Sequence, residues 1–216
     1  MPAYYPVYLN LQGHLCVVVG GGAVAEGKIG HLLDCGARVR VVAPEVTAAV
    51  ADWSAQGKVE WVQRRYQVGD LAGAFLAIAG TDDTSVNKDV AWEAGRLNVL
   101  LNVVDVPSLC TFIAPAVVRW GPVTVAISTS GASPALARRL REEMQDAESC
   151  RCMAWADAAG LISDVRTQLR REGVQVDPEH WQRCLDSELL DMVRHGRSSQ
   201  ARERLLAMLK AGAAPS

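Results

Sequence analysis

Short, continuous apolar runs dominate the hydrophobic pattern in the first half of the chain. The runs at residues 15–19, 75–79 and 98–104 are rich in valine, leucine, isoleucine and alanine, and residues 39–43 follow the same pattern with one arginine. Such runs are typical of strands that are buried on both faces of a sheet. The shorter run at residues 59–62 predicts a further strand.

Segments with helical spacing lie between these runs. Ile29, Leu32 and Leu33 share one face of a helix that follows the first run and ends at Gly36. Residues 46–56 and 86–95 predict two further helices. Because strands and helices alternate, we expect an α/β fold with a Rossmann-type, doubly wound parallel sheet.

The pattern changes after Cys110. Two apolar runs on either side of Gly121 and Pro122 predict a β-hairpin. A helix is then expected with Ser133 as its N-cap and Pro134 as its first residue, running to about residue 148.

Amphipathic helices account for the rest of the chain, and they are expected at residues 153–171, at 178–196 and from 198 onward. We therefore expect a Rossmann domain at residues 1–112, a small α+β region at 113–149 and a helical region at 150–216.

A glycine-rich turn joins the first strand to the first helix. Gly20, Gly21 and Gly22 follow the strand directly, and Ala25 stands where a third small residue lets the helix pack close to the strand. Gly22 would let the backbone approach a pyrophosphate, with the free N–H groups of the helix start facing the phosphates. The unit predicts dinucleotide binding, whereas the simpler interpretation of three glycines after a strand is a plain turn.

Glu45 adds to the dinucleotide interpretation. It lies 23 positions after Gly22, near the spacing of about 20 at which an acidic residue meets the hydroxyls of the adenine-side ribose. The ordinary alternative is a solvated carboxylate after Pro44. Glu45 favours NAD, while Arg38 and Arg40 keep a 2′-phosphate, and hence NADP, open as the alternative.

Two further strands are followed by polar residues. Thr81 and Asp83 come after the run at 75–79, at the carboxyl edge where ligands bind in such folds, and helix capping alone would also explain Asp83. Asp105 follows the run at 98–104 at the same edge. A carboxylate there could act as a general base, and a turn-forming aspartate is the alternative.

A hydroxyl-rich loop at residues 128–133 forms a second candidate anion site. Its backbone N–H groups precede a helix that carries Arg138 and Arg139. The alternative role of these arginines is pairing with Glu142 and Glu143 four positions later, on a solvated face.

Composition limits the other possibilities. The chain has 216 residues, 50% hydrophobic and 21% charged, and a net charge of −2 gives no case for bulk nucleic-acid binding. No apolar run approaches the roughly 20 residues that span a bilayer, and the start lacks the basic residues of a secretory signal, so we expect a cytoplasmic protein.

The six cysteines, including Cys150 and Cys152, have no metal-ligand spacing, so reduced thiols and no metal site are expected.

These motifs together resemble the precorrin-2 dehydrogenases, which occur as separate proteins or as the N-terminal module of siroheme synthases. The resemblance covers about residues 4 to 145. It rests on residues 5–11, 20–26 with Lys28, 43–45, 81–83 with Asn87, 102–105, 112–113 with 115–116, and 127–134, in the family's order.

The resemblance implies NAD-dependent oxidation of precorrin-2 to sirohydrochlorin, followed in some members by insertion of ferrous iron. It also implies a homodimer, in which the segment after about Phe112 builds the interface and helps line the active site. By position, Ala23, Val24, Pro44 and Glu45 correspond to NAD contacts.

Further roles carry over residue by residue. Asp105 corresponds to the aspartate regarded as catalytic for dehydrogenation and, in bifunctional members, for chelation. Because this substrate carries ionised acetate and propionate groups, we separately expect the hydroxyl-rich loop with Ser128, Thr129 and Ser130, together with Arg138, to bind them, and Arg119 and Lys28 are further candidates. Thr129 stands where the multifunctional synthase has a serine that can be phosphorylated.

One position departs from the family pattern. Gly27 replaces the usual arginine between the glutamate and the lysine of the turn. This change costs about 0.5–1 kcal/mol of helix propensity and removes a charge near the turn, but the glycine turn itself is intact.

Two other functions compete with a plain dehydrogenase. The first is an enzyme that also inserts ferrous iron, for which no His or Cys ligand cluster is expected. The second is a non-catalytic NAD-sensing module, although a DNA-binding sensor would need a basic helix-turn-helix that the sequence lacks.

Overall fold

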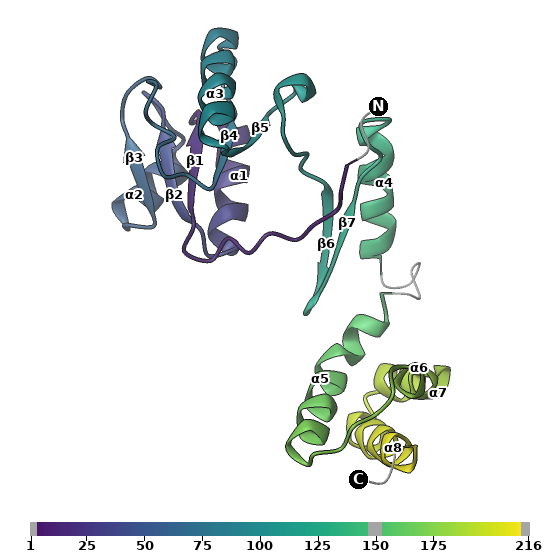
Figure 1. Ribbon diagram of the computed structural model, residues 1–216. Helices are drawn as coiled ribbons and strands as arrows, with labels where there is room; N and C mark the ends of the chain where they lie inside the picture. Colours follow the sequence, from purple (N-terminus) through teal and green to yellow (C-terminus); the bar gives the residue numbers. More distant parts are fainter. Residues whose placement is uncertain (1–3, 147–152, 213–216) are drawn as a thin grey trace. The chain divides into compact units, whose positions relative to one another are not determined.

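The computed structural model describes residues 4–146 and 153–212, which fall into two compact units (Figure 1). The first unit ends at Ala114 and the second begins at Pro115. The division of the second unit into a dimerisation region and a helical region stays a prediction.

The first unit is built on a five-stranded sheet with the order β3-β2-β1-β4-β5, in which all neighbours are parallel. The strands are β1 (Leu15–Val19), β2 (Arg38–Val42), β3 (Val59–Val62), β4 (Leu76–Ala79) and β5 (Leu100–Val103). The predicted parallel sheet is therefore confirmed. Because the strands run the same way, all five of their carboxyl ends lie at one edge.

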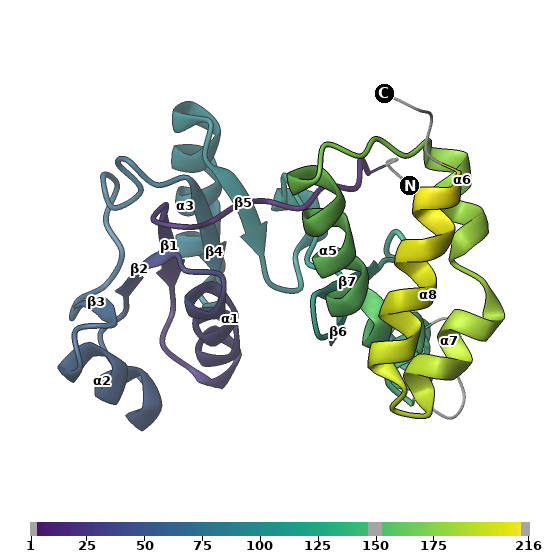
Figure 2. The same cartoon turned by 90° about the horizontal axis from the view of Figure 1, so that it is seen from below.

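Helices cover both faces of this sheet (Figure 2). Cys16 and Val18 of β1 pack with α1 (Ala23–Asp34) and α2 (Ala48–Ala55), whereas Val17 and Val19 pack with α3 (Thr84–Leu97). These four side chains are at most 2% exposed, so β1 is buried on both faces as its continuous apolar run predicts.

The connection from β3 to β4 contains no helix. Tyr66 and Leu71 of this segment pack on the face that α3 covers, and Leu71 is completely buried. The segment therefore takes the place of a crossover helix, and α3 is the element that holds it.

The helix expected at residues 86–95 is longer at both ends in the structure, and α3 begins at Thr84. The helix expected to end at Gly95 continues to Leu97, and it ends at Asn98, which adopts the left-handed conformation with φ 55°. An asparagine in this conformation ends a helix as a glycine does, and Gly95 is tolerated inside it.

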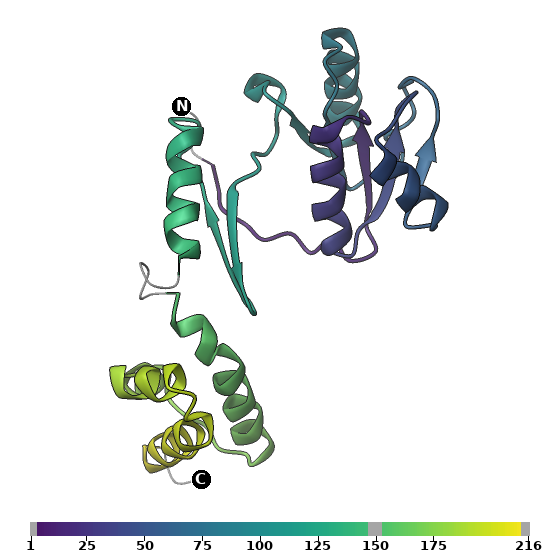
Figure 3. The same cartoon turned by 180° about the vertical axis from the view of Figure 1, so that it is seen from behind.

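The second unit begins with a β-hairpin and a helix (Figure 3). Strands β6 (Ala116–Trp120) and β7 (Val123–Ile127) are antiparallel, and α4 (Pro134–Gln145) packs against both. Ser133 caps α4 by accepting a hydrogen bond from the Leu136 N–H, as predicted. The last residues of the predicted helix, 147 and 148, lie outside the described residues.

A cluster of helices completes the second unit. It consists of α5 (Trp155–Arg171), α6 (Pro178–Cys184), α7 (Ser187–Arg194) and α8 (Ser198–Ala211), which share one apolar core. The single helix expected at 178–196 is wrong, because Asp186 caps a new helix by accepting a hydrogen bond from the Leu189 N–H.

Within residues 4–146 and 153–212, no helix is both long and apolar enough to cross a membrane. Cys16, Cys35, Cys110 and Cys184 are thiols that form no disulfide, whereas Cys150 and Cys152 lie outside the described residues.

Candidate functional site: a cleft at the carboxyl edge of the sheet

A cleft of about 370 Å³ opens at the carboxyl edge of the first unit's sheet. The residues that line it follow the ends of four strands, and they are Val19–Gly22, Val42–Glu45, Arg65, Tyr66, Gly80–Asp83 and Val86. The structure thus brings together residues that the sequence singled out, namely Gly20, Gly21, Gly22, Pro44, Glu45, Thr81 and Asp83.

Two glycines of the turn are needed by the fold itself. Gly20 has φ 120°, and a Cβ on it would stand 2.5 Å from the carbonyl oxygen of Gly80. A Cβ on Gly21 would clash with the carbonyl oxygen of Glu45. The turn after β1 therefore lies directly against the backbone that follows β4 and β2, and no side chain fits between them.

Gly22 is different, because the protein leaves open space beside it. A Cβ there would meet no atom within 4 Å, and its φ of −77° suits any residue. Gly22 is also the N-cap of α1 and supplies no capping side chain, whereas Thr47 and Asp83 cap α2 and α3. Open space at an uncapped helix start is what a pyrophosphate requires, so the turn fits a dinucleotide.

The first residues of α1 lie beside this space. Ala23 and Val24 are exposed and do not line the cleft themselves. Ala25 is buried, and its Cβ lies 3.6 Å from where a Cβ on Gly80 would stand. The small residues therefore let α1 approach the end of β4 closely, as the sequence pattern predicts.

The loop after β4 is fixed by hydrogen bonds. Asp83 accepts hydrogen bonds from the N–H groups of Ser85 and Val86, which confirms its capping role. A hydrogen bond from the Ser85 hydroxyl, and then these two backbone bonds, hold the pKa of Asp83 below its ordinary value. Asn87, which is buried, donates from Nδ2 to the carbonyl oxygen of Thr81 at 3.1 Å. Thr81 is thereby held at the cleft wall.

Arg65 lines the cleft, although the sequence pattern did not single it out. The arginines that the sequence did single out lie elsewhere. Arg40 forms an ion pair with Glu60 on the neighbouring strand, with 3.0 Å between the atoms, and Arg38 is the first residue of β2. Neither is among the residues that line the cleft, so the alternative in which they serve a 2′-phosphate gains no support from this geometry. The signal that could have revealed Arg65 is its place three residues after the end of β3.

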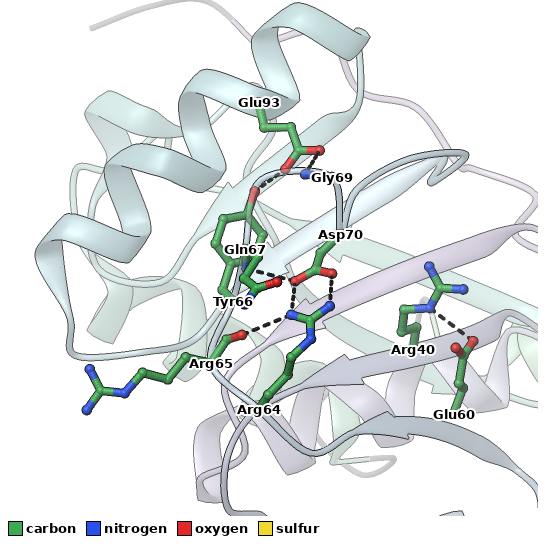
Figure 4. Close-up of polar contacts among 9 residues, drawn as sticks. All are labelled: Arg40, Glu60, Arg64, Arg65, Tyr66, Gln67, Gly69, Asp70 and Glu93. Atoms are coloured by element: carbon green, nitrogen blue, oxygen red, sulfur yellow. Dashed lines mark hydrogen bonds and ion pairs between the residues drawn. The ribbon is translucent and has the colours of Figure 1, made fainter.

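A network of hydrogen bonds holds the loop that carries Arg65 (Figure 4). Arg64 makes a bidentate pair with Asp70, at 2.8 and 2.6 Å, across the loop. Glu93 of α3, which is 4% exposed, accepts hydrogen bonds from the Tyr66 hydroxyl and the Gly69 N–H. Burial, and then the bond to Glu93, raise the pKa of Tyr66, so the hydroxyl keeps its proton.

Asp105 lies outside the cleft lining, two residues after the end of β5. Its side chain is exposed, and its backbone is left-handed with φ 59°. The thiol of Cys110 clamps the turn, because it accepts from the Val103 N–H at 3.1 Å and lies 3.2 Å from the Val103 carbonyl oxygen. Asn102 donates to the Phe112 carbonyl oxygen at 3.1 Å. The exposed carboxylate thus stands on a turn that the surrounding contacts define closely.

The predicted substrate residues belong to the second unit. Thr129 bonds across its loop, where its hydroxyl donates to the Ser133 carbonyl oxygen at 3.0 Å and accepts from the Ser133 N–H at 3.1 Å. The Ser128 hydroxyl accepts from the N–H of Ser130, which is left-handed with φ 52°.

Arg138 lies on the exposed face of α4, where Glu142 pairs with it at 2.8 Å, and Arg139 pairs likewise with Glu143 at 2.7 Å. The pairing expected as the alternative is therefore present, and the substrate role of Arg138 stays a prediction.

Comparison with known families agrees with this geometry. Residues 7–116 match a family model described as "Putative NAD(P)-binding", and residues 121–147 match one described as "Sirohaem biosynthesis protein central". The two models together cover the cleft and the unit that follows it as far as α4.

Individual relatives extend the match over nearly the whole chain. The siroheme synthase of Methylococcus capsulatus is 38% identical over 97% of this chain, and that of Nitrosococcus oceani is 34% identical over 98%. The chain spans 44% and 45% of these relatives' own lengths, so it matches less than half of each.

A solved structure matches as well. SirC, a precorrin-2 dehydrogenase, superimposes with a TM-score of 0.74 and 28% identity, over 93% of this chain and the whole of its own. The helical region after α4 therefore has a counterpart in a known structure.

Proposed function

Because the chain belongs to the NAD(P)-binding family of siroheme biosynthesis that includes siroheme synthases and precorrin-2 dehydrogenases, we propose that it oxidises precorrin-2 to sirohydrochlorin with NAD. The observation that carries the proposal is the open space at Gly22, beside the uncapped start of α1.

The cleft residues bind the cofactor in this proposal. The N–H groups at the start of α1, including those of Ala23 and Val24, take the pyrophosphate, and Gly20 and Gly22 keep the backbone close to it. Pro44 and Glu45 follow β2, and the Glu45 carboxylate accepts hydrogen bonds from the adenine-side ribose hydroxyls. A carboxylate at that position favours NAD over NADP, because it would repel a 2′-phosphate.

Asp105 acts as the base. When bound, NAD supplies the acceptor for the hydride that precorrin-2 loses. The substrate must also lose a proton as its conjugation extends, and the exposed Asp105 carboxylate, at the same edge of the sheet as Thr81, takes it. The contacts of Cys110 with Val103 hold the backbone of the turn that carries this carboxylate.

We further propose that the chain forms a homodimer through β6, β7 and α4. Support comes from the exposure of this region. No residue of α4 is buried, Leu136 is 49% exposed, and a two-stranded sheet has little stability alone. Ser128, Thr129, Ser130 and Arg138 of the same region remain the predicted ligands of the substrate carboxylates.

An anaerobic assay of the wild-type protein tests the reaction. Precorrin-2 is supplied with NAD or with NADP, and the absorbance of the reduced cofactor is followed together with the spectrum of sirohydrochlorin. We expect equal amounts of the two products, formed faster with NAD. Dinucleotide binding without turnover would contradict the proposal and favour a sensing module.

Iron insertion is tested separately. Ferrous iron is added after oxidation is complete, with and without the protein. A spectral change that the protein accelerates would add chelation to the proposed activity, whereas equal rates would restrict the protein to dehydrogenation.

A further inference from the structure

The strand order indicates where the adenine ring would lie. In the proposed complex the pyrophosphate meets the turn after β1, and the ribose meets Glu45 after β2. In NAD, the adenine base is attached to this ribose and lies on the side away from the pyrophosphate. Because β3 is the next strand outward from β2, the base extends toward the segment that follows β3. Arg65 and Tyr66 are the cleft residues of that segment.

The guanidinium of Arg65 is available for a ligand. Arg64 is occupied by Asp70, and Figure 4 shows the Arg65 side chain extending away from that pair. Within the described part of the chain, the Arg65 side chain makes no hydrogen bond or ion pair. It does lie close enough to the α3 cap that its charge contributes, after the hydrogen bonds from Ser85 and Val86, to the low pKa of Asp83.

The backbone around Arg65 is held in place from both sides. The Arg65 carbonyl oxygen accepts a hydrogen bond from Arg64 Nη1 at 2.9 Å. The next residue, Tyr66, is tied to the buried Glu93 carboxylate of α3, which also receives the Gly69 N–H at 2.9 Å. Only the Arg65 side chain has to become ordered when a ligand binds, so little entropy is lost.

The charges of the cleft decide which part of the ligand Arg65 meets. Three carboxylates, those of Glu45, Asp82 and Asp83, line the cleft together with this one arginine. A further dianionic phosphate on the ribose would face those carboxylates. An adenine ring is neutral, and a planar guanidinium stacks well on an aromatic face.

We propose that Arg65 stacks its guanidinium on the adenine ring and so determines the affinity for the adenosine half of the cofactor. This inference rests on the proposed function, because it assumes that the cleft binds a dinucleotide. Glu93 acts as a positioning residue, since it holds the loop that presents Arg65.

Calorimetric titration of the full chain tests this assignment. NAD and NADP are titrated directly, and AMP is measured by displacement of NAD. For Arg65→Ala we expect NAD and AMP to bind more weakly by the same factor, roughly 5- to 30-fold, with an unchanged ratio of NAD to NADP affinity. Arg65→Lys keeps the positive charge but lacks the planar guanidinium group. We expect it to lose most of the NAD and AMP affinity that Arg65→Ala loses.

Arg38→Ala is the matched control, because Arg38 is exposed on the same sheet at the first residue of β2. We expect it to bind all three nucleotides as the wild type does.

Several results would overturn the assignment. A loss confined to NADP would place the 2′-phosphate at Arg65, and a loss for NAD without a loss for AMP would place Arg65 beyond the adenosine. Full affinity in Arg65→Lys would show that only charge matters, and unchanged binding in Arg65→Ala would remove Arg65 from the site. Failure of the wild type to bind any of the nucleotides would instead refute the proposed function.

Discussion

The carbonyl oxygen of Gly80 stands 2.5 Å from the position that a Cβ on Gly20 would occupy. The backbones that follow β1 and β4 therefore meet with no room for a side chain, and both glycines line the cleft. Gly20 also has a φ of 120°, which L-residues with a side chain rarely adopt. Gly22, two residues later, has neither constraint, so the two glycines serve different purposes.

This difference predicts opposite results for two alanine variants. Gly20→Ala should lower the melting temperature markedly, because the backbone must shift. Gly22→Ala should fold with normal stability but bind NAD at least 10-fold more weakly, because its methyl group would occupy the space of the pyrophosphate. Thermal denaturation and calorimetric titration measure the two effects.

Gly27→Ala is the control for this pair, since Gly27 lies in α1 with open space around it. We expect it to gain about 0.5–1 kcal/mol of stability with unchanged NAD affinity. If Gly22→Ala bound NAD as tightly as the wild type, the turn would be structural only.

Removing the hydrogen bond between Tyr66 and Glu93 should destabilise the protein. Tyr66→Phe leaves the buried Glu93 carboxylate with fewer donors, and we expect a loss of about 1–3 kcal/mol in the free energy of unfolding. Affinity for NAD should also fall, because the loop that carries Arg65 is less well held. Chemical denaturation and titration at pH 7 would check both.

The pH dependence of the same variant follows from the pKa of Tyr66. In the unfolded chain this tyrosine ionises near pH 10, whereas burial and Glu93 raise its pKa in the folded protein. The stability that it contributes is therefore fully present below pH 10 and is lost as the pH rises above it. The difference in the free energy of unfolding between wild type and Tyr66→Phe should shrink above pH 10. A constant difference would show that the hydrogen bond between Tyr66 and Glu93 does not contribute this stability.

Arg138 offers a test of substrate binding in the second unit. We expect Arg138→Ala to raise the KM for precorrin-2 several-fold while the affinity for NAD stays the same, because one cation for the substrate carboxylates is lost. Arg139→Ala is the matched control, since Arg139 has the same kind of partner four residues later. Steady-state kinetics with precorrin-2 measure this KM in both variants. If Arg138→Ala and Arg139→Ala had equal KM values, Arg138 would be removed from the substrate site.

Local patterns in the sequence were sufficient to predict the parallel sheet and the glycine-rich turn. The run at β1 is apolar throughout, and the structure buries it on both faces. Gly20, Gly22, Pro44, Glu45 and Thr81 meet at one edge because parallel strands end there, and that rule can be applied without coordinates.

Contacts between distant segments were beyond the reach of the sequence pattern. Arg65 follows β3 without a glycine or proline signal, and its importance depends on Glu93, which lies 28 positions later on another element. The break between α6 and α7 was missed for a different reason. Asp186 is a capping residue, but an apolar pattern that continues past it predicts one helix.

The most direct test of the proposed reaction is the anaerobic oxidation of precorrin-2 by Asp105→Asn at saturating NAD. Asparagine tolerates the left-handed backbone at φ 59° as aspartate does, so the variant should fold normally, whereas alanine would add about 1–2 kcal/mol of strain. We predict that the variant binds NAD with wild-type affinity and forms NADH and sirohydrochlorin about 100- to 10,000-fold more slowly. Oxidation by Asp105→Asn at the wild-type rate would show that this carboxylate is not the base.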